Sequence, residues 1–140
     1  MQRKAILDTG FFYATIDKKD RNHLRVIQAL PTVSEQILLP VPVLVEVSYL
    51  LASRLGHSFM RRCIRQLAES PLELLSVMPS DMLRIHELLE QYSDLKLDFV
   101  DATIVTLAER LDIQKILTVD VRDFRTIRPK HCAYFDIVPS

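Results

Sequence analysis

The chain contains little glycine and little cysteine, and each shortage excludes a class of site. Only two glycines occur among 140 residues, Gly10 and Gly56, which excludes the glycine-rich loops that hold nucleotide phosphates. Cys63 and Cys132 lie far apart, without a CxxC motif or a nearby histidine pair, so neither a zinc site nor a disulfide framework is indicated. We therefore expect reduced thiols and no nucleotide cofactor.

Net charge and long apolar segments are absent as well. The 18 basic and 18 acidic residues balance, so any contact with nucleic acid must come from a local patch of charge. The longest apolar stretch, around residues 41–52, contains a glutamate and is shorter than the roughly 20 residues of a membrane span. A strand-like run begins within a few residues of Met1, which leaves no room for a signal peptide. These features predict a cytoplasmic protein without a membrane segment.

Short apolar runs alternate with longer helical patterns, without an internal repeat or a flexible linker. The length and the 49% hydrophobic content suit one domain over residues 1–140. The alternation favours an α/β fold, a three-layer α/β/α sandwich around a mainly parallel central sheet. The expected strands are residues 4–7, 36–39, 72–77, 116–119 and 133–138. The expected helices are residues 24–30, 42–55, 57–69, 81–92 and 98–111, with a short helical turn at 121–124.

Two of these helices, residues 42–55 and 98–111, are apolar on almost every side. A helix that is apolar all round is normally buried. We therefore expect both to be central, and a subunit interface is one way to bury the first.

Four carboxylates lie on or directly after apolar segments. Asp8 and Asp120 each end an apolar run, and Glu46 and Asp101 each lie inside one. A buried ionised acid is strongly unfavourable unless its charge is offset. A shared metal ion is the simplest explanation for all four.

The expected fold brings these acids to one edge of the sheet. In parallel sheets, ligands bind beyond the carboxyl ends of the strands, where the next helices begin. Asp8 and Asp120 end strands, Glu46 lies one turn into a helix, and Asp98 and Asp101 share one face of a first helical turn. All five therefore map to that edge.

Helix capping is the alternative interpretation for three of these acids. Asp98 can cap its helix with Asp101 as the capping-box partner, Asp8 can cap the helix that starts near Phe11, and Asp120 can cap the following turn. Each cap is compatible with an ordinary structural role.

Capping does not explain Glu46, whose alternative is a buried salt bridge to an arginine such as Arg54. Oxygen ligands without histidine or cysteine select Mg²⁺ or Mn²⁺, and one or two such ions suit phosphodiester hydrolysis. A non-catalytic binding domain is a second hypothesis. A phosphatase or phospho-receiver domain is a third, but it would need an acid two residues after Asp8, where Gly10 stands.

Four segments in this order resemble the PIN-domain nucleases, most of all the VapC-type toxins of bacterial toxin–antitoxin pairs: residues 6–9, Glu46 in its apolar helix, residues 97–111 and residues 117–124. The resemblance covers essentially the whole chain. It implies an α/β/α fold and a Mg²⁺- or Mn²⁺-dependent endoribonuclease acting on RNA. It also implies a homodimer and a small antitoxin protein whose basic residue enters the acidic pocket.

Carried over by position, the resemblance gives one set of site residues. The catalytic, metal-binding acids are Asp8, Glu46, Asp101 and Asp120, with Asp98 as a further metal ligand. Asp123 corresponds to an accessory acid of some members. Many relatives have a serine where this chain has Gly10, which puts a hydroxyl contact at that position in doubt.

RNA near an acidic pocket needs basic residues at the rim. Arg122 and Arg125 follow Asp120, and Lys18 and Lys19 follow the segment after Asp8, so these four are candidate RNA-binding residues. Ordinary solvated charge is the alternative for each. Three aromatic residues are candidates for stacking on bases, although core packing is the better interpretation for both phenylalanines: Tyr13, Phe12 and Phe124.

Overall fold

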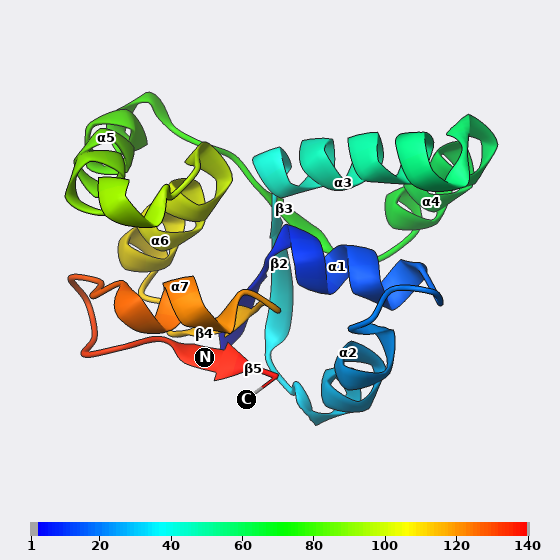
Figure 1. Cartoon of the computed structure of the whole chain (residues 1–140), viewed down its shortest axis with the longest axis horizontal. Coiled ribbons are helices and arrows are strands. Elements are labelled where there is room, and N and C mark those ends of the chain that lie inside the picture. Colours follow the sequence, from blue (N-terminus) through cyan, green and yellow to red (C-terminus); the bar gives the residue numbers. More distant parts are fainter. Residues whose placement is uncertain (1–2, 140) are drawn as a thin grey trace.

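A five-stranded parallel sheet forms the centre of the molecule (Figure 1). The structure is a computed structural model that describes residues 3–139. Its strands are β1 (Lys4–Leu7), β2 (Gln36–Pro40), β3 (Glu73–Leu75), β4 (Lys115–Leu117) and β5 (Asp136–Val138), in the spatial order β3-β2-β1-β4-β5. The expected α/β class with a parallel sheet is confirmed.

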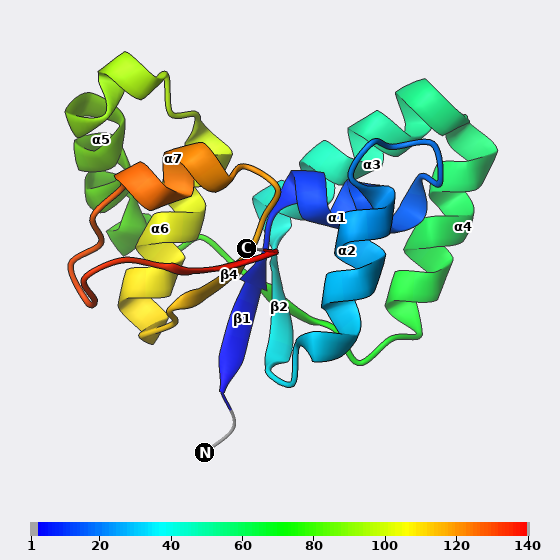
Figure 2. The same cartoon turned by 60° about the horizontal axis from the view of Figure 1, so that its bottom comes forward.

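Helices cover both faces of this sheet. The helices are α1 (Thr9–Ile16), α2 (His23–Ala29), α3 (Val41–Leu55), α4 (His57–Ala68), α5 (Met82–Gln91), α6 (Phe99–Leu111) and α7 (Val121–Thr126), with short 3₁₀ turns η1 (Leu30–Thr32), η2 (Pro79–Asp81) and η3 (Ser93–Leu95). Helices α1–α4 lie on one side of the sheet and α5–α7 on the other (Figures 1 and 2). This is the arrangement that right-handed crossovers give for this strand order, and it makes the expected three-layer sandwich.

The strand order reverses between β1 and β4. The chain passes from β1 outward through β2 to β3, then returns to place β4 on the other side of β1. Leu7 pairs with Leu117 at the carboxyl ends of these two strands. Such a reversal leaves a crevice outside the strand ends, where α/β proteins bind ligands.

The sheet and α6 form the core. The central strands are buried on both faces, which explains why their sequences are continuously apolar. Helix α6 is buried at every position from Ala102 to Ala108, so its expected central place is confirmed. The core therefore fixes the ends of β1 and β4 and the start of α6 relative to one another.

The expectation that α3 is buried all round is wrong for the single chain. Val43, Val47 and Leu51 are buried, but the side chains of Val45 and Tyr49 are 65% and 71% exposed. The helix packs against α1 and α4 and leaves its outer face open. Its apolar outer face is therefore a surface feature.

Three predicted strands are too long. The structure shortens residues 72–77 and 133–138 to three-residue strands, because each lies at a sheet edge with a partner on one side only. Strand β4 ends at Leu117 rather than at residue 119, which releases Thr118 from the strand.

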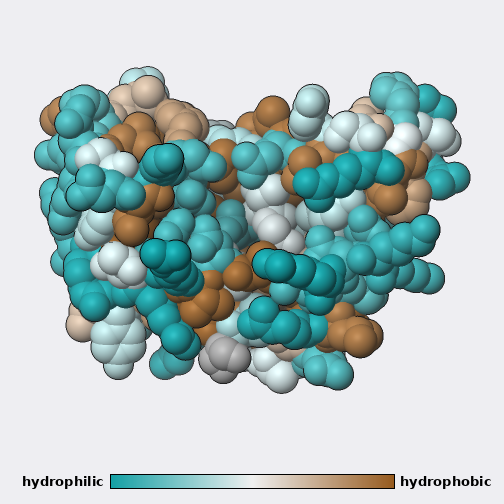
Figure 3. Space-filling view, in the orientation of Figure 1, coloured by the Kyte–Doolittle hydropathy of each residue, from teal (hydrophilic) through white to brown (hydrophobic). Residues whose placement is uncertain are grey.

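Figure 3 shows a mostly hydrophilic surface with scattered apolar residues and a hollow between the two helical groups. None of the helices in residues 3–139 is long and apolar enough to cross a membrane.

Candidate metal centre

Asp8 directly follows β1 and is held by two segments, the start of α1 and residues 117–118. Its backbone N–H donates to the carbonyl of Leu117 at 2.9 Å, which ties the end of β1 to β4. Its Oδ1 accepts from the backbone N–H of Thr9 at 2.7 Å and caps α1. The side chain is buried, with 6% of the residue exposed. Capping is thus one role of Asp8, one that leaves Oδ2 directed elsewhere.

Thr118 joins Asp8 to Asp120. The Thr118 hydroxyl donates to Oδ2 of Asp8 at 2.6 Å and accepts from the backbone N–H of Asp120 at 3.0 Å. The backbone N–H of Asp120 is the donor in the second bond. The single hydroxyl proton of Thr118 is therefore used for the bond to Asp8. Thr118 is fully buried, so this hydroxyl fixes two site residues from within the core.

Asp98 and Asp101 lie at the start of α6. Asp98 caps the helix by accepting from the backbone N–H of Asp101 at 2.9 Å, as its capping interpretation predicts. The carboxylate of Asp101 remains free of a capping role and lies among the other acids. The cap by Asp98 therefore fixes the backbone of Asp101 and does not use the Asp101 carboxylate.

Asp120 and Asp123 start α7. Asp120 caps this helix by accepting from the backbone N–H of Asp123 at 3.4 Å. One carboxylate oxygen each from Asp101, Asp120 and Asp123 lie within 4.8 Å of one another. Asp123, which the sequence indicated only as an accessory acid, is thus in the tightest group. Its spacing of three residues from a strand-end acid was the signal for it.

Glu46 lies in the second turn of α3. It is close enough for its charge to act on the Asp8 carboxyl, but it is outside the three-oxygen group. Its expected alternative partner, Arg54, instead lies over the ring of Tyr13, 5.0 Å from the ring centroid. No ion pair in the described part of the chain involves Glu46, so the salt-bridge interpretation is wrong.

The acids of this group disfavour one another's charge. Burial raises the pKa of Asp8 to about 6, and the charges of Asp120 and Glu46 add to the rise, against the hydrogen bonds from Thr118 and Thr9. Burial, followed by the charges of Asp8 and Asp98, raises the pKa of Asp101 to about 8. Burial and the charge of Asp123 raise the pKa of Asp120. These are the shifts expected of clustered carboxyls without a cation.

The donor set fits a divalent metal ion. All the groups are carboxylates, which suit Mg²⁺ or Mn²⁺, and their oxygens converge at the crevice where α/β proteins bind ligands. Within residues 3–139, no lysine or arginine forms an ion pair with any of these acids. Asp101, Asp120 and Asp123 can hold the ion directly, and Asp8, on which the charge of Glu46 also acts, adds its charge to this group.

Close packing explains why position 10 is a glycine. A Cβ at this position would lie 2.7 Å from Cγ2 of Val119, closer than real contacts allow. Val119 stands between Thr118 and Asp120, so the missing side chain at Gly10 lets that segment approach α1. A serine here would collide with Val119.

The other candidate residues for RNA binding fall into an exposed basic group and a buried aromatic group. Arg122 and Arg125 on α7 and Lys18 and Lys19 after α1 are exposed, in positions open to a ligand. Tyr13 and Phe124 are buried and Phe12 is packed against the core, which removes all three as stacking surfaces.

Comparison with known proteins places the chain in a family. The PIN domain family matches residues 5–128, and the chain belongs to it. Ribonuclease VapC26 of Mycobacterium tuberculosis is 28% identical over 134 residues, covering 96% of this chain and 99% of that protein.

Solved structures show the same fold. The sarcin–ricin loop cleaving toxin VapC20 of M. tuberculosis has a TM-score of 0.73 at 20% identity, over 80% of this chain and 86% of that one. VapBC2 from Rickettsia felis, bound to a DNA fragment from its promoter, has a TM-score of 0.68 at 15% identity, over 96% and 98%. The expected likeness to VapC-type PIN domains is confirmed.

Proposed function

We propose that this protein is a Mg²⁺- or Mn²⁺-dependent endoribonuclease and the toxin of a toxin–antitoxin pair. The observation that carries the proposal is the convergence of Asp101, Asp120 and Asp123 within 4.8 Å, beside the buried Asp8, without a basic partner among the described residues. The name of the 28% identical relative, a ribonuclease, supports the same activity. Cleavage of RNA would place its action in the cytoplasm.

The chain's own residues prepare the site. Three helix starts present the acids, because Asp8, Asp98 and Asp120 each cap the helix that follows them. Thr118 holds Asp8 in one orientation and keeps its negative charge favourable. A bound divalent ion would neutralise charge on the phosphate and lower the pKa of a bound water. Asp8 and Glu46 would help to hold that ion, directly or through water.

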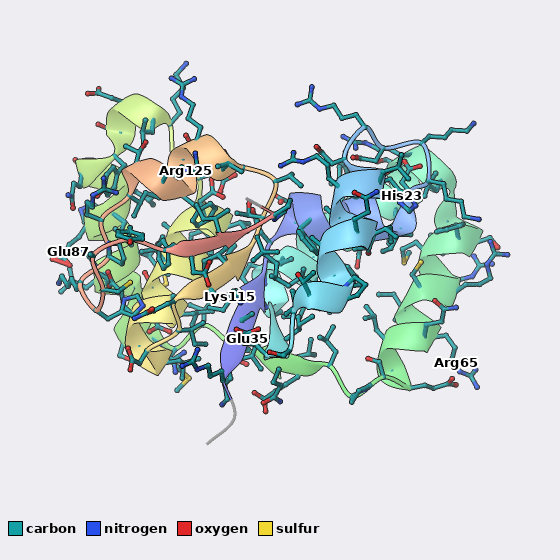
Figure 4. The ribbon with its side chains drawn as sticks, turned by 90° about the horizontal axis from the view of Figure 1, so that it is seen from below. His23, Glu35, Arg65, Glu87, Lys115 and Arg125 are labelled. Carbon is teal, nitrogen blue, oxygen red and sulfur yellow. The ribbon has the colours of Figure 1, made fainter. Side chains whose placement is uncertain are left out.

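Four exposed cations are proposed to bind the RNA backbone around the acids. Arg122 and Arg125 lie on α7, directly after Asp120, and Figure 4 labels Arg125 on that helix. Lys18 and Lys19 lie beyond the far end of α1, about 12 Å of helix from Asp8. Phosphates on both sides of the cleavage point would then meet positive charge.

Two protein partners are proposed. Toxin–antitoxin complexes from Klebsiella pneumoniae and R. felis share the fold, which supports a small antitoxin whose basic residue enters the acidic pocket. The exposed outer face of α3, with Val45 and Tyr49, supports a homodimer. Light scattering on Val45→Glu tests this contact, with Leu83→Glu on the exposed face of α5 as the matched control. A dimer that persists in Val45→Glu would contradict it.

The activity is tested on purified protein freed of any antitoxin. We expect single-stranded RNA to be cut with Mg²⁺ or Mn²⁺ and to survive with a chelator. Sequencing RNA ends after controlled expression of the wild type and of Asp8→Ala then maps the target. If no RNA is cut and Asp101→Asn leaves the cellular effect unchanged, the proposal is wrong and a non-catalytic PIN-like binding domain is favoured.

A further inference from the structure

The helices α1 and α3 both start near acids of the site, pack against each other and leave the sheet in the same direction (Figures 1 and 2). Asp8 caps the start of α1, and Glu46 lies in the second turn of α3, where its charge acts on the Asp8 carboxyl. Arg54 follows Glu46 by eight residues of α3, a rise of about 12 Å. The far ends of both helices therefore lie about this distance from the acids.

A buried tyrosine and an aspartate join these far ends. Tyr13 is buried in α1, and its hydroxyl donates to Oδ2 of Asp17 at 2.6 Å. Oδ1 of Asp17 accepts from the backbone N–H of Lys19 at 2.9 Å. The guanidinium carbon of Arg54 lies 5.0 Å from the centroid of the Tyr13 ring. The pair thus brings Arg54 of α3 together with the loop that follows α1.

Positive charge is in excess at this place. The hydrogen bonds from Tyr13 and from the N–H of Lys19 hold the pKa of Asp17 below its ordinary value, and the charges of Lys19 and Arg54 act in the same direction. Two cations therefore lie near one acid. Within residues 3–139, Arg54 forms no ion pair, and both cations are exposed. A guanidinium with five N–H donors is thus held at the surface without an acidic partner.

Arg54 lies away from the face of α3 that is proposed for the dimer. Nine residues separate it from Val45, which corresponds to a turn of about 180° around the helix. A homodimer through Val45 would therefore leave Arg54 open to another ligand. The excess of positive charge favours an anion, and a guanidinium matches the paired oxygens of a phosphate.

We infer that Arg54 binds a backbone phosphate of the RNA substrate, beside Lys19 and apart from the phosphate that is cleaved. This inference rests on the proposed nuclease function. RNA is the polyanion that must already reach the acids, and it carries a phosphate at every nucleotide. The substrate then extends from the acids along α1 and α3. An RNA too short to reach Arg54 binds more weakly.

Kinetics on a short RNA that spans the mapped cleavage site test this anchor. We expect Arg54→Gln to raise KM about 10- to 100-fold with little change in kcat, as for the loss of a charged hydrogen bond made equally in the ground and transition states. Arg54→Lys should recover part of the affinity, because it keeps the charge and loses the planar fork. Arg62→Gln is the matched control. Arg62 also lies over an aromatic ring, 5.4 Å from the centroid of Phe59, but on α4, which carries no acid of the site.

Replacing single phosphates of the RNA separates binding from a structural role of Arg54. Each phosphate in turn is exchanged for an uncharged methylphosphonate. At one position away from the cleaved bond, the exchange should raise the KM of the wild type about 10- to 100-fold and leave the KM of Arg54→Gln unchanged. If Arg54 only supported Tyr13, every exchange would have the same effect in both proteins.

The outcomes distinguish this inference from the function on which it rests. If the wild type cuts RNA but no exchange loses its effect in Arg54→Gln, or if Arg62→Gln raises KM equally, the anchor is wrong and the nuclease stands. If Arg54→Gln cuts RNA normally but no longer binds a small protein encoded next to it, Arg54 serves the antitoxin and the inference is overturned. If the wild type cuts no RNA, the proposed function and the anchor are both wrong.

Discussion

The amino edge of the sheet, where its strands begin, and the carboxyl edge, where they end, differ in whether their acids are paired with a base. At the amino edge, Nζ of Lys115 lies 2.8 Å from Oε2 of Glu35 and 3.6 Å from Oδ2 of Asp136, and Figure 4 shows Lys115 and Glu35 next to each other. The hydrogen bond that Lys115 donates to Glu35 lowers the pKa of Glu35 and raises the pKa of Lys115. At the carboxyl edge, the pKa values of Asp8 and Asp101 are raised instead.

This difference separates acids that the fold pairs with a base from acids that it leaves without one among the described residues. Glu35 has only 9% of its side chain exposed, and the fold gives it a lysine. The chain therefore provides partners for buried carboxylates where it needs only stability. Leaving a whole cluster unpaired lowers the stability of the free protein, which is the expected cost of a site completed by a cation.

The largest expected effects come from replacing one acid at each edge, and the two replacements should change stability in opposite directions. Asp101→Asn should reduce RNA cleavage by more than about 100-fold, since even the hydrogen-bond partners of metal ligands are worth about 10- to 100-fold. At pH 9, above the Asp101 pKa of about 8, it should also raise the melting temperature of the metal-free protein, because a repelled charge is removed. Activity assays and thermal unfolding in chelator measure the two quantities.

The matched change at the amino edge is Glu35→Gln. Cleavage should be unaffected, and the free energy of unfolding should fall by about 1–3 kcal/mol, because Lys115 loses a charged hydrogen bond. If Asp101→Asn and Glu35→Gln both lower stability, the contrast between the edges is not real.

Thr118 offers a sharper test within the carboxyl edge. Thr118→Val keeps the shape of the side chain and removes the proton committed to Asp8, so we expect Mn²⁺ affinity to fall by about 10- to 100-fold. Thr118→Ser should recover most of it. Equal loss in both variants would show that packing of the methyl group, rather than the hydrogen bond, matters here.

The raised pKa values predict how the metal-free protein responds to pH. Asp101 has a pKa of about 8 in the fold and 3.8 as an ordinary group, so its protonated form favours folding and this stability is lost as pH rises through about 8. Asp8 contributes in the same direction through about 6. Thermal unfolding in chelator from pH 5 to 9 should show a falling melting temperature. Asp101→Asn should show a shallower fall, and an equal fall would exclude Asp101 as the cause.

The smallest expected effect concerns RNA binding by Lys18 and Lys19. Replacing both with alanine should reduce the slope of log KM against log salt by about 1.4, or about 0.7 for each phosphate contact to single-stranded RNA. Arg65→Ala is the control, because its side chain pairs with Glu69 at 2.7 Å on α4. A slope unchanged by the lysine substitutions would remove them from the RNA path.

The sequence predicted the fold well because the parallel strands are buried on both faces and read as continuous apolar runs. It also placed the acids at one edge, since a strand end and a helix start are visible from residue types alone. It failed for α3, whose apolar composition indicates burial but cannot show which neighbours are present. The lengths of the outer strands β3 and β5 were also overestimated, because the sequence does not show that each has a neighbouring strand on one side only.

Contacts between distant segments could not be read from the sequence. The bond from Thr118 to Asp8 spans 110 residues and depends on the register of β1 with β4. The collision that excludes a side chain at Gly10 arises from Val119 in the same segment. Asp123 enters the cluster because it lies in the first turn of α7, whose start at residue 121 the sequence predicted, but the approach of this turn to Asp101 on α6 was not predictable from the sequence.

Calorimetric titration of Mn²⁺ into the metal-free protein tests the carboxyl-edge cation site most directly. We predict binding to wild type and to Glu35→Gln with equal affinity, no measurable binding to Asp101→Asn, and a melting temperature that rises with Mn²⁺ only in the first two, by mass action. Absence of heat and of a thermal shift in wild type, or equal binding by Asp101→Asn, would contradict a cation site at the carboxyl edge of this sheet.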